Sequence, residues 1–241
     1  MIRDLVRRVE RRRAIRRRRP TPFPDPHVAW IRRATRGEIH YSLDHVLDRA
    51  VAELPGSEPV LEIGSFCGLS TNLIAYLLRK RGRSNSFFTT DPWTFEEEVG
   101  ETVPGSSIPV TEYRALIQGQ FKTNVAFWNR ERPPHSFALS SDDFFVAWRD
   151  GQERTDLWGR SVKLGGPLAF CFVDGAHAAE NVRRDFENVD AHLVDGGLIL
   201  FDDSDPYGRY PHIYGIVEEA VGGGYELLAD YPAHLIRKGG G

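Results

Sequence analysis

The chain has 241 residues, 41% of them hydrophobic, and a formal net charge of −3 at pH 7. This length and composition allow one sizeable core, so a single α/β domain is the default expectation. No stretch approaches about 18 consecutive apolar residues, which argues against a membrane span. The two cysteines, Cys67 and Cys171, form no disulfide or zinc pattern, and they predict buried free thiols in a reducing cytoplasm.

Charge is distributed unevenly along the chain. Residues 1–20 hold ten arginines against Asp4 and Glu10, and the +8 of this tail and the −11 of the remaining chain make up the net charge of −3. The proline-rich residues 20–26 cannot be helical and indicate a stiff linker. We therefore divide the chain into a basic tail with linker, residues 1–26, and a folded domain, residues 27–241.

Three roles stay open for the basic tail. It could be a solvated, largely disordered extension. It could contact nucleic acid or anionic lipid through the arginines of residues 3–19. It could also pack on a partner subunit, and a homo-oligomer stays open on that ground.

After the linker, the pattern predicts alternating helices and strands. In chain order these are helices at 27–34 and 42–53, a strand at 59–63, a helix at 70–81, a strand at 86–90, a polar insertion at 94–111, a helix at 112–128, a strand at 136–139, a strand at 168–173, a helix at 178–193, a strand at 197–201, a helix at 213–221, and a closing antiparallel pair at 225–231 and 233–237. The alternation predicts an α/β fold with a mostly parallel sheet, an antiparallel C-terminal strand, and helices on both faces.

Two of the predicted strands are apolar runs that end abruptly in carboxylates. Asp174 follows the fourth strand, and Asp202 and Asp203 follow the fifth. Because ligands bind at the carboxyl ends of parallel strands, neighbouring strands would bring these three aspartates together, with His177 beside them. Crowded carboxylates repel one another unless a cation or shared protons hold them, and such hard oxygen ligands suit Mg²⁺.

Structural roles stay open for the same residues. An aspartate followed by glycine, as at Asp174, often caps the next helix. Asp202 and Asp203, which precede Ser204, could be turn residues, and His177 could be an ordinary hydrogen-bonded histidine.

The first predicted strand leads into a glycine-containing turn and a helix start. Gly64 would permit a sharp turn and close approach of a ligand, and Gly68 would let the helix pack near the strand. Ser70 and Thr71 are candidate N-caps. The spacing departs from the dinucleotide pattern G-x-G-x-x-G, since Phe66 lies where the middle glycine would be. This disfavours NAD and favours a ligand without a phosphate.

An acidic residue, Asp91, ends the second predicted strand, about where the ribose hydroxyls of an adenosine ligand would lie. Together, Glu62 and Asp91 suit a ligand that carries both an amino group and a ribose. The glycines alone would fit a tight turn in any α/β protein, and Asp91 at a strand end makes that explanation weaker.

These residues carry a family resemblance. The segment from Glu62 to Thr71 resembles the first motif of class I S-adenosylmethionine-dependent methyltransferases, and Asp91-Pro-Trp93 resembles the acidic motif that follows. The pattern Asp174-Gly-Ala-His177, continued by Gly196-Gly197 and Asp202-Asp203, is similar to metal-dependent small-molecule O-methyltransferases, which include sugar enzymes of antibiotic biosynthesis and, more distantly, the catechol type. The resemblance covers about residues 40–237 and implies a Rossmann-like fold with a seven-stranded sheet.

The resemblance also implies roles for individual residues. Asp174, Asp202 and Asp203 would bind Mg²⁺, and Asp174 and His177 would form the catalytic pair, with His177 as the base. The cofactor S-adenosylmethionine would be bound by Glu62, Gly64, Ser65, Gly68, Ser70, Thr71, Asp91, Trp93, Ser141, Asp142 and Asp174. Within this set, Glu62 and the glycine loop would line the methionine part, Asp91 the ribose, and Ser141 with Asp142 the adenine.

Several aromatic and loop positions are further candidates. Trp93 would stack on the adenine, cover the substrate, or simply pack in the core. Segments 94–111 and 204–212 should overhang the same sheet edge and form a substrate lid, the second of them with Tyr207 and Tyr210. Weaker candidates for substrate contact are Tyr113, Trp128 and His212.

The expected reaction is methyl transfer to a hydroxyl of a small molecule, sugar-like or phenolic. A divalent cation would stabilise the developing alkoxide, and His177 would accept the proton. Two alternatives stay open: an RNA methyltransferase that uses the arginine-rich tail, and a nonenzymatic cofactor-binding protein. The acidic body weighs against the first, and the carboxylates at both strand ends weigh against the second. The sequence leaves the acceptor, the regiochemistry and the oligomeric state open.

Overall fold

The computed structural model describes residues 22–95 and 100–240. The arginine-rich tail and the first two residues of the predicted linker therefore lie outside the described residues. Within the described residues, seven strands form one sheet in the order β3-β2-β1-β6-β7-β9-β8. They are β1 (Val60–Ile63), β2 (Phe87–Thr90), β3 (His135–Phe137), β6 (Leu168–Val173), β7 (Leu193–Phe201), β8 (Glu226–Asp230) and β9 (His234–Arg237).

The sheet is mostly parallel. β1 pairs in parallel with β2 and β6, β2 with β3, and β6 with β7, whereas β9 runs antiparallel to both β7 and β8. This confirms the predicted seven-stranded sheet with an antiparallel C-terminal strand. It also confirms that the two carboxylate-terminated strands, β6 and β7, are neighbours.

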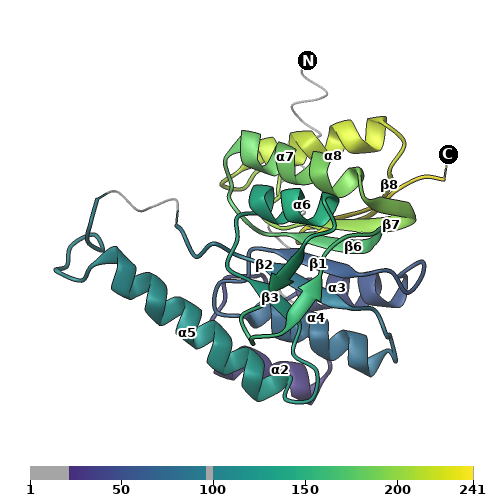
Figure 1. The fold of residues 1–241 in the computed structure, drawn as a ribbon. Helices are drawn as coiled ribbons and strands as arrows, with labels where there is room; N and C mark the ends of the chain where they lie inside the picture. The colour runs from purple at the N-terminus through teal and green to yellow at the C-terminus, as the bar shows by residue number, and fades with distance from the viewer. Residues whose placement is uncertain (1–21, 96–99, 241) are drawn as a thin grey trace.

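Helices cover both faces of the sheet, as predicted (Figure 1). They are α2 (Pro26–Ala34), α3 (Leu43–Ala52), α4 (Leu69–Lys80), α5 (Val110–Trp128), α6 (Ser141–Arg149), α7 (Ala179–Asp190) and α8 (Pro211–Gly222). Because strand side chains alternate between faces, Phe170 and Phe172 of β6 pack with α2, α3 and α4, whereas Cys171 and Val173 pack with α6, α7 and α8. β6 is therefore buried on both sides, which explains its continuous apolar run.

The described end of the predicted linker packs on the folded body. Asp25 is the N-cap of α2, and its side chain accepts a hydrogen bond from the backbone N–H of His27 at 2.8 Å. The same carboxylate accepts hydrogen bonds from Tyr76 and Lys80 of α4, at 2.8 and 2.6 Å. Asp25 thus helps to hold α2 against α4.

Two elements between residues 140 and 167 escape prediction from the sequence: α6, and the antiparallel hairpin of β4 (Glu153–Thr155) and β5 (Ser161–Lys163). The signal for α6 was present, because Ser140 caps it by accepting the backbone N–H of Asp143 at 3.1 Å. Ser-x-x-Asp ahead of an apolar run is a helix-start pattern. β7 is also longer than predicted, because it begins at Leu193 and continues through Gly196.

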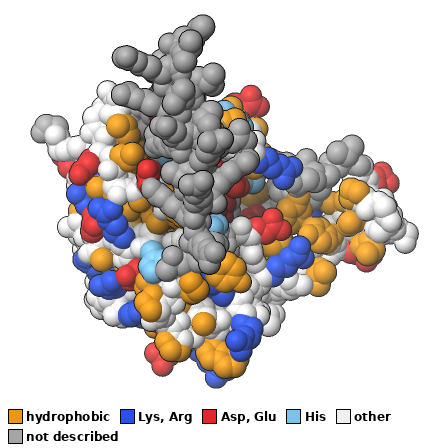
Figure 2. Space-filling view, turned by 180° about the vertical axis from the view of Figure 1, so that it is seen from behind, with side chains coloured by type: hydrophobic (Ala, Val, Ile, Leu, Met, Phe, Trp, Pro, Cys, Tyr) orange, Lys and Arg blue, Asp and Glu red, His pale blue; other side chains and the backbone are white. Residues whose placement is uncertain are grey.

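The helix α5 extends away from the rest of the domain in Figure 1. Figure 2 shows hydrophobic side chains exposed along the arm that this helix and the segment before it form, where Ile108 and Leu116 are 50% and 56% exposed. Over the described part of the chain, no helix combines the length and apolarity needed to cross a membrane.

Candidate active site

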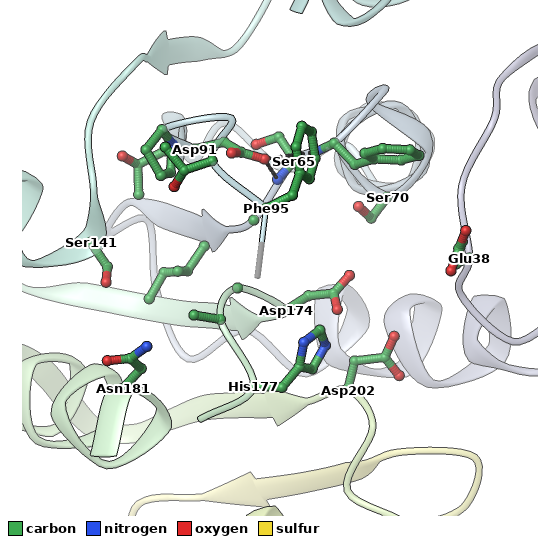
Figure 3. Close-up of a pocket in the computed structure, with 18 of the residues that line it drawn as sticks. Glu38, Ser65, Ser70, Asp91, Phe95, Ser141, Asp174, His177, Asn181 and Asp202 are labelled. Carbon is green, nitrogen blue, oxygen red and sulfur yellow. Dashed lines mark hydrogen bonds between the residues drawn. The ribbon is translucent and has the colours of Figure 1, made fainter. Parts of the chain in front are cut away.

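A cavity of about 730 Å³ opens at the carboxyl ends of the central strands. The register pairs Ile63 of β1 with Thr90 on one side and with Val173 on the other, and it pairs Val173 with Phe201 of β7. The residues that follow these strands therefore lie side by side. Figure 3 shows Asp174, His177 and Asp202 along one side of this pocket, with Asp91 and Phe95 across from them.

Gly64 and Gly68 owe their identity to chain packing. Gly64 has φ 86°, and a Cβ there would fall 1.9 Å from the carbonyl oxygen of Asp174, so the close approach of two strand ends requires glycine. Gly68 has φ 88° and is the N-cap of α4, and a Cβ there would meet Val125 and Phe121 of α5 at 3.1 and 3.2 Å. The neighbour of Gly68 is therefore α5, whereas the sequence suggested the strand. Gly64 lines the cavity, and Gly68 does not.

Ser70 and Thr71 lie inside the first turn of α4, because the helix begins at Leu69 and its N-cap is Gly68. Ser70 lines the cavity. Thr71 is buried and donates a hydrogen bond to Oε2 of Glu62. The two residues thus serve the site and the core rather than the helix cap.

Glu62 is completely buried beneath this turn and does not line the cavity. Its Oε1 atom has no hydrogen-bond partner. Burial, which the hydroxyl hydrogen bonds offset only in part, raises the pKa of Glu62 to about 7. Glu62 therefore places an acidic group directly behind the cavity wall that Gly64 and Ser70 line.

Asp91 organises two loops from the end of β2. One carboxylate oxygen accepts the backbone N–H groups of Ser65 and Phe66, both at 2.8 Å, and the other accepts that of Trp93 at 2.6 Å. Phe66 and Trp93 have φ of 43° and 51°, in the left-handed region that non-glycine residues rarely adopt. The charge of Asp91 helps to hold both in place, while Asp91 and Ser65 line the cavity.

Trp93 does not reach the cavity. Its indole is 2% exposed, donates from Nε1 to the carbonyl oxygen of Phe66 at 2.9 Å, and packs edge-on against Phe121 at 5.2 Å between ring centroids. This position fits the core-packing role that the sequence left open for Trp93, and it offers no face to an adenine.

Asp174, His177 and Asp203 form the tightest cluster of potential metal ligands in the described residues. One ligand atom from each lies within 4.8 Å of the others, and His177 Nε2 is 3.1 Å from Asp203 Oδ2. Asp202 lines the same cavity but is not part of this group, so the structure brings together two of the three predicted metal ligands and adds the histidine. Oxygen donors with one imidazole fit a divalent cation.

Electrostatics at this cluster favour a bound cation. Burial, together with the charges of Asp202 and Asp203, raises the pKa of Asp174 well above its ordinary value. Burial and the charge of Asp203 raise the pKa of Asp202 to about 7. A nearby positive charge would relieve this repulsion and restore the ionised forms.

The segment after β7 holds His177 in place. The ring of Tyr210 stacks on the imidazole of His177 with centroids 4.3 Å apart and planes 9° apart. His212 Nε2 lies 2.6 Å from the carbonyl oxygen of His177, a position from which it donates. Of the two segments predicted to form a lid, 204–212 therefore contacts the cavity through His177, and Phe95 and Val103 of the other line the cavity directly.

Ser141 and Asp142 line the opposite end of the cavity from the first turn of α6. Asp142 pairs with Arg184 of α7, at 3.2 Å between Oδ2 and Nε. Behind them, burial raises the pKa of Asp185 to about 6, and the hydroxyl of Ser141 partly offsets this.

Sequence reasoning missed several residues of the cavity wall. Arg36, Gly37, Glu38 and Ile39 contribute one side of it, in the segment that joins α2 to α3, and residues Asn181 and Arg184 of α7 contribute another. The 36–39 segment follows no strand, so no strand-end pattern could have pointed to it. Of the weaker candidates, Tyr113 lines the cavity and Trp128 packs against His27 instead.

Comparisons with known proteins agree with this geometry. Residues 61–204 match the model of a family described as a methyltransferase domain. Among curated proteins, none matches the chain in sequence. Of the solved structures, the O-methyltransferase NovP aligns with 17% identity and a TM-score of 0.55, over 84% of this chain and 81% of NovP.

Two further solved structures align over most of their length. The O-methyltransferase TomG from Streptomyces achromogenes, solved in complex with S-adenosylmethionine, shares 14% identity over 91% of this chain and 92% of its own, with a TM-score of 0.52. An O-methyltransferase from Bacillus cereus, solved with S-adenosylhomocysteine, shares 16% identity over 89% of this chain and 90% of its own, with a TM-score of 0.50. At these identities the likeness shows a common fold.

Proposed function

Because the chain belongs to the methyltransferase-domain family, we propose that it is an S-adenosylmethionine-dependent O-methyltransferase that methylates a hydroxyl of a small sugar-like or phenolic molecule with the help of Mg²⁺ or a similar cation. The observation that carries this proposal is the convergence, at one cavity, of the loop after β1, of Asp91, and of the Asp174, His177 and Asp203 cluster. One wall suits an adenosine-type cofactor, and the other suits a hydroxyl nucleophile.

The residues at the ends of β1 and β2 would bind the cofactor. A carboxylate has about four lone-pair sites, and Asp91 uses three of them on backbone N–H groups, so one stays open for a ribose hydroxyl. Glu62 lies buried beneath this wall and does not line the cavity, so its carboxyl would attract the amino group of the methionine part through its charge rather than by direct contact. Ser141 and Asp142, at the far end, are placed to meet the adenine.

The cluster at the ends of β6 and β7 would hold the cation, through Asp174 and Asp203 with His177 adjacent and Asp202 completing the acidic set. When bound there, a divalent cation supplies stabilisation of the developing alkoxide. Tyr210 fixes the plane of the His177 ring, which can then accept the hydroxyl proton. The cavity walls would align the nucleophile with the methyl group, which is a large part of catalysis in such transfers.

The cysteines and the charge of the cavity bear on the compartment and the partners of the protein. Cys67 and Cys171 are both free and buried, which supports the reducing cytoplasm as the location. The RNA alternative depends on the basic tail, which lies outside the described residues. Six carboxylates and two arginines line the cavity in the described residues, and that excess of negative charge favours a small substrate over a polyanion.

Calorimetry with S-adenosylhomocysteine tests the proposal, followed by transfer of a labelled methyl group from S-adenosylmethionine to a panel of phenolic and sugar acceptors. We expect saturable cofactor binding and turnover that EDTA stops and Mg²⁺ restores. Failure of the wild-type protein to bind the cofactor would refute the whole proposal. Turnover that EDTA leaves untouched would refute only the part that concerns the cation.

A further inference from the structure

Arg36 stands out among the charged residues of the cavity. Two arginines line the cavity in the described chain, and Arg184 is neutralised by Asp142. Arg36 forms no ion pair with any described carboxylate, although six of them line the same cavity. A guanidinium without an ion pair at the wall of a cavity can bind an anionic group of a ligand.

Phe66 provides a rigid support for the Arg36 side chain. The guanidinium carbon lies 5.5 Å from the centre of the Phe66 ring. Asp91 accepts the backbone N–H of Phe66, and Trp93 donates to its carbonyl oxygen, so the support is fixed from both sides. A guanidinium held over a ring keeps its in-plane N–H groups available for two parallel hydrogen bonds to one carboxylate.

The backbone that carries Arg36 is equally constrained. A Cβ on Gly37 would fall 2.5 Å from Cβ of Leu69, so the segment lies directly against the start of α4. On its other side, Arg32 donates to the carbonyl oxygens of Ile39 and His40 at 3.3 and 3.0 Å. A group positioned in this way loses little conformational freedom when it binds a ligand.

We propose that Arg36 is the anion-binding residue of the cavity and that it takes a carboxylate of a bound molecule in a two-point hydrogen bond. The inference rests on the proposed function, because S-adenosylmethionine carries two positive groups that suit the acidic cavity and one carboxylate that the same acids repel. Arg36 would neutralise the charge of such a carboxylate. The carboxylate could belong to either of two molecules: the methionine part of the cofactor, or an acceptor that carries an acidic group.

The first arm of the test addresses the cofactor. Calorimetry compares wild type, Arg36→Gln and Arg36→Lys with S-adenosylhomocysteine and with S-adenosyl-3-thiopropylamine, which keeps the amine and lacks the carboxylate. If the cofactor is the source, Arg36→Gln weakens S-adenosylhomocysteine binding roughly 10- to 100-fold, since a hydrogen bond to a charged group is worth that much. The decarboxylated compound then binds both proteins alike, and Arg36→Lys restores part of the loss.

The second arm addresses the acceptor. Protein saturated with S-adenosylhomocysteine and Mg²⁺ is titrated with 3,4-dihydroxybenzoate and with 3,4-dihydroxybenzyl alcohol, two probes that differ in the acidic group. If the acceptor is the source, Arg36→Gln weakens binding of the benzoate by a similar factor and leaves the alcohol and S-adenosylhomocysteine unchanged.

Arg33 supplies the matched control, because its guanidinium lies 4.9 Å from the ring centre of Trp30 and does not line the cavity. Arg33→Gln should bind every probe as wild type does. If Arg36→Gln also binds S-adenosylhomocysteine and both dihydroxy probes as wild type does, the inference is wrong while the proposed function stands. If wild type binds no S-adenosylhomocysteine, both are wrong.

Discussion

The two halves of the cavity differ in how the chain satisfies their polar groups. At the ends of β1 and β2, the fold supplies most of the partners: Asp91 accepts three backbone N–H groups, and Thr71 donates to Glu62, of which only Oε1 has no hydrogen-bond partner. At the ends of β6 and β7, Asp174 and Asp202 lie among other carboxylates, and burial and mutual repulsion raise their pKa values. Folding therefore supplies most of the hydrogen bonds of the first half, whereas the crowded carboxylates of the second half need a bound positive charge.

Backbone strain accompanies both halves. The non-glycine residues with positive φ in the described chain are Phe66, Trp93 and Asp203, and they follow β1, β2 and β7. Such conformations persist only where the surroundings enforce them, and they concentrate at functional sites. At Phe66 and Trp93 the carboxylate of Asp91 helps to enforce them, which makes Asp91 the structural centre of the first half.

The largest expected effect is a fall in turnover when a carboxylate at the ends of β6 and β7 is removed. Asp203→Asn should lower kcat/KM roughly 100- to 1,000-fold, because stabilising the developing alkoxide through a cation is worth several kcal/mol. Affinity for S-adenosylhomocysteine should stay at the wild-type value, since the first half is intact. Steady-state kinetics and calorimetry on the same preparation check both statements.

Asp205→Asn is the matched control in the same segment. Asp205 accepts the backbone N–H of Tyr207 at 2.9 Å and does not line the cavity, so its substitution should leave turnover unchanged. Equal losses in both variants would mean that the segment, rather than the carboxylate cluster, sets the rate.

The next largest effect is a fall in the stability of the fold when Asp91, at the end of β2, is replaced. Asp91→Asn loses a charged acceptor shared by three backbone N–H groups, and we expect the free energy of unfolding to fall by about 3 kcal/mol. Urea denaturation measures this, with Asp142→Asn, another aspartate that lines the cavity, as the control. Weaker cofactor binding without a loss of stability would show that Asp91 serves only the ligand.

Glu62 makes the free energy of unfolding depend on pH. Its pKa is raised from 4.5 to about 7 in the fold, so between these values the folded state holds a proton that the unfolded state has released. The free energy of unfolding therefore falls as the pH rises through this window. Glu62→Gln should remove this cost, and relative to wild type it should gain about 1 kcal/mol at pH 5 and about 3 kcal/mol at pH 8.

Urea denaturation at both pH values measures the gain for Glu62→Gln. The same variant should bind S-adenosylhomocysteine more weakly, since it loses the acidic group behind the wall that would attract the amino group. A gain that is equal at pH 5 and pH 8 would mean that the substitution acts through packing and that Glu62 does not titrate in this window.

The smallest expected effect comes from the ring that supports His177. Aromatic stacking is worth about 1 kcal/mol, so Tyr210→Leu should lower kcat roughly 3- to 10-fold, and Tyr210→Phe should stay near wild type. Affinity for S-adenosylhomocysteine should not change in either variant. If Tyr210→Phe loses as much as Tyr210→Leu, the hydroxyl rather than the ring supports the site.

The sequence predicted which strand ends form this cavity, because the end of each strand can be located from the sequence. Each apolar run that stops at an aspartate marks the carboxyl edge of a parallel strand, and β6 and β7 confirmed that their aspartates meet there. The match to the methyltransferase-domain family confirms the resemblance drawn from the same residues. Positions of this kind depend on local sequence alone.

Side-chain directions depended on contacts that the sequence does not display. Asp202 and Asp203 are adjacent, yet only Asp203, at φ 50°, falls within the tight cluster with His177. Trp93 is buried because Phe121 of a distant helix packs against it. Arg36 reaches the cavity from a connection with no strand end, where only tertiary packing on Leu69 brings it near.

Mn²⁺ binding followed by electron paramagnetic resonance tests most directly whether the second half is completed by a cation. For the protein saturated with S-adenosylhomocysteine, we expect one Mn²⁺ site per chain in wild type, its retention in Asp205→Asn, and its loss in Asp203→Asn. Absence of the site in wild type, or undiminished binding in Asp203→Asn, would contradict the assignment of the Asp174 and Asp203 carboxylates, beside His177, as the place where the cation binds.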